Sequence, residues 1–179
     1  MDLSSTYFEL FGLPQSFLVD TGQLDERYRE LQRTVHPDRF VNATDQERRL
    51  SMQLAIRINE GYRTLKDPLR RGRYLLELGG HVFDDEQHTT SDTGFLMEQV
   101  ELREALEEVR AADDPFSALN GIMDRIAADF DALTGELQQR LGSAGKDGPA
   151  AETLMKMQFF RRLHEEAQEL EAALEDELD

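Results

Sequence analysis

His36, Pro37 and Asp38 place an imidazole and a carboxylate two positions apart, with a proline between them, in the segment VHPDRF. An imidazole nitrogen and a carboxylate oxygen can bind zinc or iron, or they can make charge-assisted hydrogen bonds to a partner. A proline donates no backbone N–H and disfavours helix in the residue before it, so the triplet predicts a loop that ends a helix. The elements on either side decide which chemistry applies.

A helix is predicted before this loop by apolar residues at steps of four, three and four, which form one buried stripe: Leu24, Tyr28, Leu31 and Val35. Arg29 and Arg33 fall on the opposite side of the same helix, and Arg27 falls on its flank. This helix should therefore present a basic face to solvent.

A second helix is predicted after the loop by another apolar stripe, formed by Leu54, Ile58, Gly61, Tyr62 and Leu65. Gly61 leaves room for a close approach, and Asp67-Pro68 ends the helix. A short segment near the start, with Tyr7, Phe8, Leu10 and Leu13, can complete a small core. The sequence thus predicts two antiparallel helices joined by an exposed loop.

This arrangement resembles the J-domain of DnaJ-type co-chaperones over about residues 4–76. Four segments, YFELFGLP, HPDRF, INEGYRTLKDPLRRGRYLLEL and SDTGFLMEQVELREALEEV, are similar to the HscB family of bacterial iron–sulfur cluster assembly over most of the chain. The resemblance implies an all-α fold in three parts. The first part is an N-terminal J-domain over 1–76, which is an antiparallel helical hairpin with the HPD loop. A connector over 77–91 follows it, and a C-terminal three-helix bundle over 92–179 binds a scaffold protein.

Composition limits the partners. Hydrophobic residues make up 39% of the 179 residues, enough for one ordinary domain or two small ones. The formal charge of −17 is unequally divided: residues 1–75 hold 12 basic and 11 acidic side chains, and residues 76–179 hold 8 and 26. An acidic chain argues against nucleic acid or an anionic membrane as the main partner, because both attract basic patches. No apolar run has membrane-spanning length and no signal peptide is evident, so we expect a cytoplasmic protein.

The second half of the chain predicts three helices with short links. The first opens near Ser91 or Asp92, whose side chains can cap it, and runs to about Ala112. The second covers about 115–141, and the third about 150–178, after a Gly-rich turn at 142–149. Helices of this length with short links are typical of a bundle.

The helix over 92–112 has more apolar residues than one core face needs. A narrow arc that must face the bundle contains Phe95, Leu102, Leu106 and Val109. Leu96, Met97 and Val100 lie about 100° to 200° away and should be exposed or at the edge. Exposed apolar residues with a polar rim often mark a protein interface, although the same residues could pack against another part of the chain.

The resemblance implies two sets of binding residues. The set for the chaperone ATPase, HscA, comprises the loop and its basic surroundings: His36, Pro37, Asp38, Arg27, Arg29, Arg33 and Arg39. The set for the cluster scaffold, IscU, comprises Leu96, Met97, Val100, Glu101, Glu104, Glu108 and Phe159. Val100 stands where a Leu is usual in the family. Phe160, beside Phe159, is nearer the core stripe of the last helix, which is formed by Leu163, Ala167, Leu170 and Leu174.

The sequence leaves three other functions open. A metal-dependent enzyme could use His36 and Asp38, or a loop group formed by His81, Asp84, Asp85, Glu86 and His88, but that loop has no spacing that fixes a ligand geometry. A structural helical protein could dimerise through 150–178, although packing within the bundle fits the pattern better. A general J-domain protein with a different client is also open. We expect a monomer without cofactor or catalytic activity. The absence of cysteine excludes a disulfide, a thiolate nucleophile and an all-cysteine cluster.

Overall fold

The computed structural model describes residues 4–36, 38, 43–83, 90, 92–141 and 147–177. Every regular element in these ranges is a helix, which confirms the all-α prediction for the described part of the chain. The chain divides into two compact units, Met1–His81 and Val82–Asp179.

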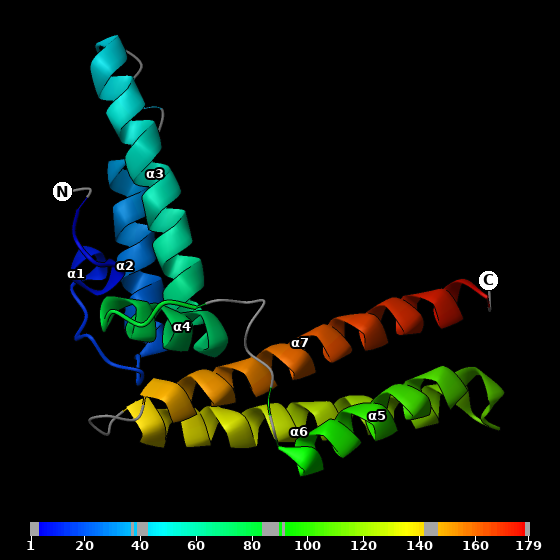
Figure 1. Ribbon diagram of the computed structural model, residues 1–179. Helices are drawn as coiled ribbons and strands as arrows, with labels where there is room; N and C mark the ends of the chain where they lie inside the picture. The colour runs from blue at the N-terminus through cyan, green and yellow to red at the C-terminus, as the bar shows by residue number, and fades with distance from the viewer. Residues whose placement is uncertain are drawn as a thin grey trace. The chain divides into compact units, whose positions relative to one another are not determined.

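The first unit contains α1 (Tyr7–Phe11), α2 (Thr21–Thr34), α3 (Asp45–Lys66) and α4 (Pro68–Leu78). Helices α2 and α3 lie side by side, as Figure 1 shows, with α1 and α4 near the end of the hairpin opposite the loop that joins them. This is the predicted hairpin with a short helix packed across it.

Side-chain caps set the helix boundaries in this unit. Thr44 and Glu47 form a reciprocal capping box at the start of α3, which satisfies amide groups that have no partner inside the helix. Asp67 ends α3 and caps α4 by accepting from the Arg70 amide at 2.8 Å, and Pro68 occupies the first turn of α4. Since α4 continues to Leu78, the first two residues of the expected connector at 77–91 are helical instead.

The core of the first unit joins α1 to the hairpin. Phe8, Phe11, Leu24, Ile58 and Leu65 are almost completely buried and belong to one apolar cluster. The two predicted stripes therefore face each other, with Val35 buried and Tyr28, Leu31, Leu54 and Tyr62 partly buried against the same cluster.

Gly61 lets α1 approach α3 closely, as predicted. A Cβ atom at this position would lie 2.8 Å from Tyr7 Cδ1, which is closer than real Cβ contacts, and 3.0 Å from Phe11 Cε2, which is tighter than most of them. Any larger residue at Gly61 would push the aromatic side chains of α1 away from the core.

The second unit contains α5 (Thr93–Glu108), the 3-10 turn η2 (Val109–Ala111), α6 (Pro115–Leu141) and α7 (Asp147–Asp176). The predicted three-helix bundle is confirmed, and Figure 1 shows α6 and α7 as a long antiparallel pair with α5 along α6. Two predicted ends were inaccurate. The α-helix of α5 stops at Glu108 and tightens into η2, and α7 starts at Asp147, so 147–149 of the predicted turn are helical.

Apolar residues from all three helices fill the bundle. Phe95, Leu102, Leu106 and Val109 are buried, as predicted, against Leu119 and Ile126 of α6 and Phe160, Leu163, Ala167 and Leu174 of α7. Across the part of the chain that the structure describes, no helix is both long enough and apolar enough to cross a membrane.

Candidate functional site

The loop after α2 turns His36 and Asp38 toward solvent. Their side chains are 60% and 87% exposed, and His36 Nδ1 lies 3.5 Å from Asp38 Oδ2. The Asp38 amide also approaches His36 Nδ1 at 3.4 Å, which makes a long and weak hydrogen bond. Pro37 and Arg39 lie outside the described residues. Neither His36 nor Asp38 is buried in the core, so both side chains can contact a partner.

A buried hydrogen bond from Ser51 fixes the start of this loop. The Ser51 hydroxyl on α3 donates to the carbonyl oxygen of Val35 at 3.0 Å, and Ser51 is only 7% exposed. Val35 precedes His36 and is itself buried. This bond ties the end of α2 to α3 next to the exposed triplet, and the apolar periodicity of the sequence does not reveal it.

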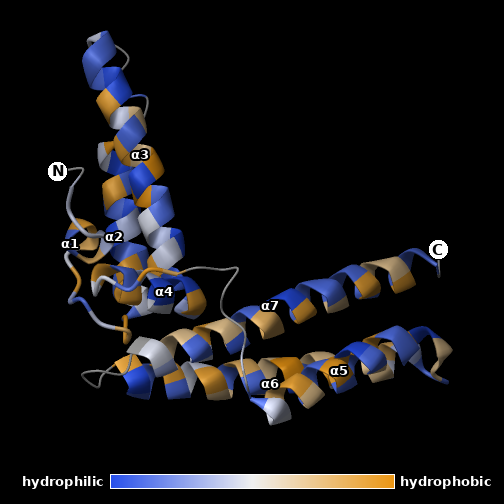
Figure 2. Cartoon of the chain, in the orientation of Figure 1, coloured by the Kyte–Doolittle hydropathy of each residue, from blue (hydrophilic) through white to orange (hydrophobic). Residues whose placement is uncertain are grey.

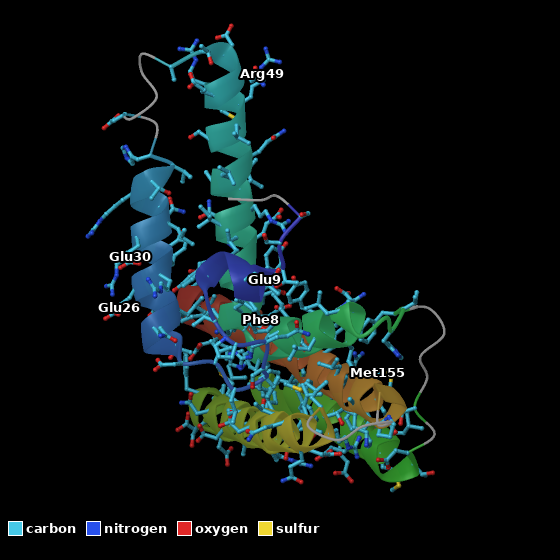
Figure 3. All side chains as sticks on the ribbon, turned by 90° about the vertical axis from the view of Figure 1, so that its left-hand side faces the viewer. Phe8, Glu9, Glu26, Glu30, Arg49 and Met155 are labelled. Carbon is cyan, nitrogen blue, oxygen red and sulfur yellow. The ribbon has the colours of Figure 1, made fainter. Side chains whose placement is uncertain are left out.

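The outer face of α2 carries both signs of charge. Arg27, Arg29 and Arg33 are exposed, as predicted. Arg27 Nη1 donates to Glu30 Oε2 at 3.0 Å, and Figure 3 places Glu26 and Glu30 on the side of α2 away from α3. The prediction of a basic face is therefore incomplete, because Glu30 pairs with Arg27 on the same helix. We call the side of α2 that carries Arg29 and Arg33 its positive edge.

Polar contacts also hold α2 against α3 near the base of the hairpin. The Asp25 carboxylate accepts from Lys66 Nζ at 2.6 and 2.8 Å and from the Tyr62 hydroxyl at 3.0 Å. These bonds lower the pKa of Asp25, chiefly through Lys66, and Asp25 raises the pKa of Lys66 in turn. Next to these bonds, the Tyr28 and Tyr62 rings stack with their centres 4.1 Å apart. The hairpin that carries the loop is thus joined by polar groups as well as by its core.

Helix α5 exposes three large apolar side chains in one region. Leu96, Met97 and Val100 are 44%, 62% and 55% exposed, which confirms the predicted exposure. Orange and blue segments alternate along α5 in Figure 2, because its core residues are interleaved with charged ones. We call Leu96, Met97 and Val100 the α5 patch.

Phe159 on α7 lies beside the buried side of α5. Its ring meets the Phe95 ring edge-on at 5.6 Å, and it is only partly buried, whereas Phe160 is 2% exposed in the core. This agrees with the predicted division between the two phenylalanines. The Arg103 guanidinium lies 5.8 Å from the Phe159 ring centre. Arg103 thus links α5 to Phe159, a contact that sequence reasoning missed.

The predicted carboxylates along α5 have different surroundings. Glu104 and Glu108 are exposed. Glu101 lies 3.9 Å from Arg125 of α6, and the same arginine pairs with Glu98 at 3.0 Å. Arg125 is a second residue that the sequence did not indicate. It holds one edge of α5 to α6.

Asp129 of α6 completes this edge, at 3.9 Å from Arg125. Burial raises the pKa of Asp129, the nearby Glu98 raises it further, and Arg125 opposes both effects. One guanidinium therefore faces three carboxylates here, so the edge keeps an excess of negative charge.

The residues that the structure describes contain no group of three or more His, Asp and Glu side chains placed to hold a metal ion. Of the second metal candidate, His81 is described, while Asp84, Asp85, Glu86 and His88 lie outside the described residues. The exposed charges near His36 and the exposed apolar side chains of α5 are both suited to protein binding.

Comparisons with known proteins agree with this assessment. Residues 91–178 match the family model described as the HSCB C-terminal oligomerisation domain. A co-chaperone protein HscB homolog of Shewanella sp. (strain ANA-3) is 46% identical over 172 residues, covering 95% of this chain and 99% of the relative. The structure of the chaperone HscB from Vibrio cholerae is similar with a TM-score of 0.84 at 40% identity, covering 95% of this chain and 99% of that one. The structure of the human co-chaperone protein HscB is similar with a TM-score of 0.87 at 32% identity, and the match covers 96% of this chain and 84% of the human one.

Proposed function

The chain belongs to the HscB family of co-chaperones, and we propose that it stimulates the ATPase of a DnaK-type chaperone, HscA, and brings to it the iron–sulfur scaffold IscU. Its role in this scheme is to bind and position other proteins. It supplies no catalytic group of its own, and it needs no resident cofactor.

The chaperone side of the proposal rests on the loop after α2. Exposed His36 and Asp38 follow a helix whose end is fixed by the bond between Ser51 and Val35. A carboxylate held in this way can pair with an arginine of the chaperone, and Arg29 and Arg33 can attract an acidic surface. Pro37, Arg39 and Arg27 belong to the same proposed interface. The exposure of His36 and Asp38 is the observation that carries the proposal.

The scaffold side rests on the α5 patch. Its three side chains form an exposed apolar surface on α5, and the same helix carries Glu101, Glu104 and Glu108 at exposed positions. A surface of this composition fits a partner with an apolar centre and basic residues around it. We propose that IscU supplies such a surface.

The decisive experiment measures ATP turnover by purified HscA with the chain, with IscU, and with both. We expect the chain to raise turnover alone and to raise it further when IscU is present. Stimulation that ignores IscU would favour the second candidate, a general J-domain protein with a different client. No stimulation of HscA or of a general DnaK chaperone would contradict both.

We assign the two roles to two parts of the chain, a J-domain over 1–76 and a scaffold-binding bundle over 92–179, separated by the connector at 77–91. We also propose a cytoplasmic monomer. The apolar stripe of α7 is largely used inside the bundle, where Leu163, Ala167 and Leu174 are buried, which leaves less apolar surface for self-association. Sedimentation at several concentrations tests the monomer against the oligomerisation named in the family description.

A further inference from the structure

Lys156 of α7 makes an ion pair with Asp92, the residue that caps the start of α5. The Lys156 ammonium donates to Asp92 Oδ2 at 2.6 Å, and its side chain is only 18% exposed. Oδ1 of the same carboxylate accepts from the Phe95 amide at 3.1 Å. The Asp92 carboxylate therefore caps the N-terminus of α5 and also joins this helix to α7.

A cluster of aromatic rings begins beside this pair. The Lys156 ammonium lies 5.3 Å from the centre of the Phe95 ring, which meets the rings of Phe159 and Phe160 at 5.6 and 6.0 Å. Lys156 and Phe159 are three residues apart on α7, so they lie on neighbouring turns of one face. The start of α5 thus packs against the part of α7 that carries Phe159.

We infer that the pair of Lys156 and Asp92 sets the position of the α5 patch relative to Phe159, so that Lys156 is a positioning residue for scaffold binding. The inference rests on the proposed function. Leu96 and Met97 lie within the first turn or so of α5, where four backbone amides lack helical partners and the helix end would otherwise fray. Fixing this turn before binding reduces the conformational entropy that association must remove.

The electrostatic surroundings agree with a formed pair. Lys156 lowers the pKa of Asp92 more than any other group does, and the amides of Phe95 and Gly94 add to the effect. Other charged and polar groups at the same place are Glu152, which lies 3.9 Å from Lys156, and Thr90, whose hydroxyl donates to Glu152 at 3.2 Å. The lowered pKa favours the ionised form of the Asp92 carboxylate, which is the form that pairs with the ammonium.

The first test measures amide hydrogen exchange in the free chain. Lys156→Met removes the ammonium and keeps an unbranched apolar stem, whereas Lys156→Arg keeps the charge. We expect amides at the start of α5 to exchange at least about tenfold faster in Lys156→Met, with α6 amides unchanged and Lys156→Arg close to wild type. Arg162→Met, which removes an exposed cation from the same helix, is the matched control. Unchanged exchange in Lys156→Met overturns the inference.

The second test is a double-mutant cycle on IscU affinity. We expect Lys156→Met to weaken binding about fivefold or more in the wild-type background and less than twofold when Phe159 is already Ala. Asp92→Asn, which keeps a capping oxygen but not the charge, should weaken binding to a similar extent and add little to Lys156→Met. Equal losses with and without Phe159 would mean that Lys156 acts elsewhere. If wild type does not bind IscU, the proposed function fails, and hydrogen exchange alone decides whether Lys156 orders α5.

Discussion

Ser51 and Val35 are 16 positions apart in sequence, yet the Ser51 hydroxyl donates a 3.0 Å hydrogen bond to the Val35 carbonyl at the point where the exposed loop begins. The carbonyl belongs to the end of α2, where no following turn of helix can satisfy it. A hydroxyl on α3 therefore completes α2 and fixes the direction in which the chain leaves it toward His36.

Ser51→Ala should uncouple the loop from α3. The change leaves the buried Val35 carbonyl without this donor, at a cost of about 1–3 kcal/mol in the free energy of unfolding. We expect chaperone stimulation to fall several-fold while the helical signal remains. Denaturant unfolding and ATPase assays check both effects. Gln53→Ala, at an exposed position two residues further along α3, is the control and should change neither.

His36→Gln should abolish stimulation of the chaperone and leave the fold intact. His36 is exposed, so replacing its imidazole removes little packing from the core. Circular dichroism and thermal unfolding should match wild type, while ATP turnover by the chaperone should stay at its unstimulated rate. A large drop in melting temperature would assign His36 to the fold instead of to the interface.

Arg29→Glu should slow association with the chaperone by reversing charge on the positive edge of α2. Because Glu26 and Glu30 already lie on this helix, the reversal leaves little positive potential for steering. The defect should shrink as salt is added, since surface charges are then screened. Stopped-flow association rates at several salt concentrations test this, with Arg162→Glu on α7 as the control for net charge. Unchanged rates at low salt would remove Arg29 from the interface.

The pair of Asp25 and Lys66 predicts how the stability of the first unit depends on pH. The folded pKa of Asp25 is lowered, so its contribution is present above its unfolded pKa, near 3.9, and is lost as the pH falls through the lower folded value. The folded pKa of Lys66 is raised, so its contribution is lost only as the pH rises through that higher value. Asp25→Asn should therefore lose less stability than wild type between pH 5 and about pH 2. Parallel acid-unfolding curves for the two proteins would contradict the pairing.

Periodicity alone predicted which faces of the helices are buried. Leu24 on α2, and Leu102 and Leu106 on α5, are buried because side chains repeat about every 100° around a helix. The same rotation predicted that Met97 would be exposed. These properties depend only on neighbours along one helix, so the sequence contains them directly.

Contacts between helices were not predictable in the same way. Lys156 meets Asp92 across 64 positions, and Arg125 meets Glu98 across 27, and no spacing rule selects these partners among the many charged residues of the second unit. The start of α7 was also missed, because the Gly-rich segment 142–149 predicted a turn, whereas its last three residues are helical and proline is tolerated in the first turn of a helix. Polar pairs between distant residues, and the residue at which a helix begins or ends, depend on contacts that form only in the folded chain.

Replacing Leu96, Met97 and Val100 together by Ser tests whether two functions are carried by two units. The three side chains are exposed, so the variant should keep its fold, but it removes the apolar centre of the proposed scaffold surface. We expect the affinity for the scaffold to fall tenfold or more, which corresponds to about 1.4 kcal/mol.

The ATPase of the chaperone separates the two roles in the same variant. Stimulation by the chain alone should survive, because His36, Asp38 and the arginines of α2 are unchanged. The additional stimulation that the scaffold provides should disappear, since the scaffold no longer reaches the chaperone through this chain. Calorimetric titration beside ATPase assays with and without scaffold measures both. If a folded triple variant binds the scaffold with wild-type affinity, the α5 patch is not the scaffold surface, and another exposed part of the bundle must be sought.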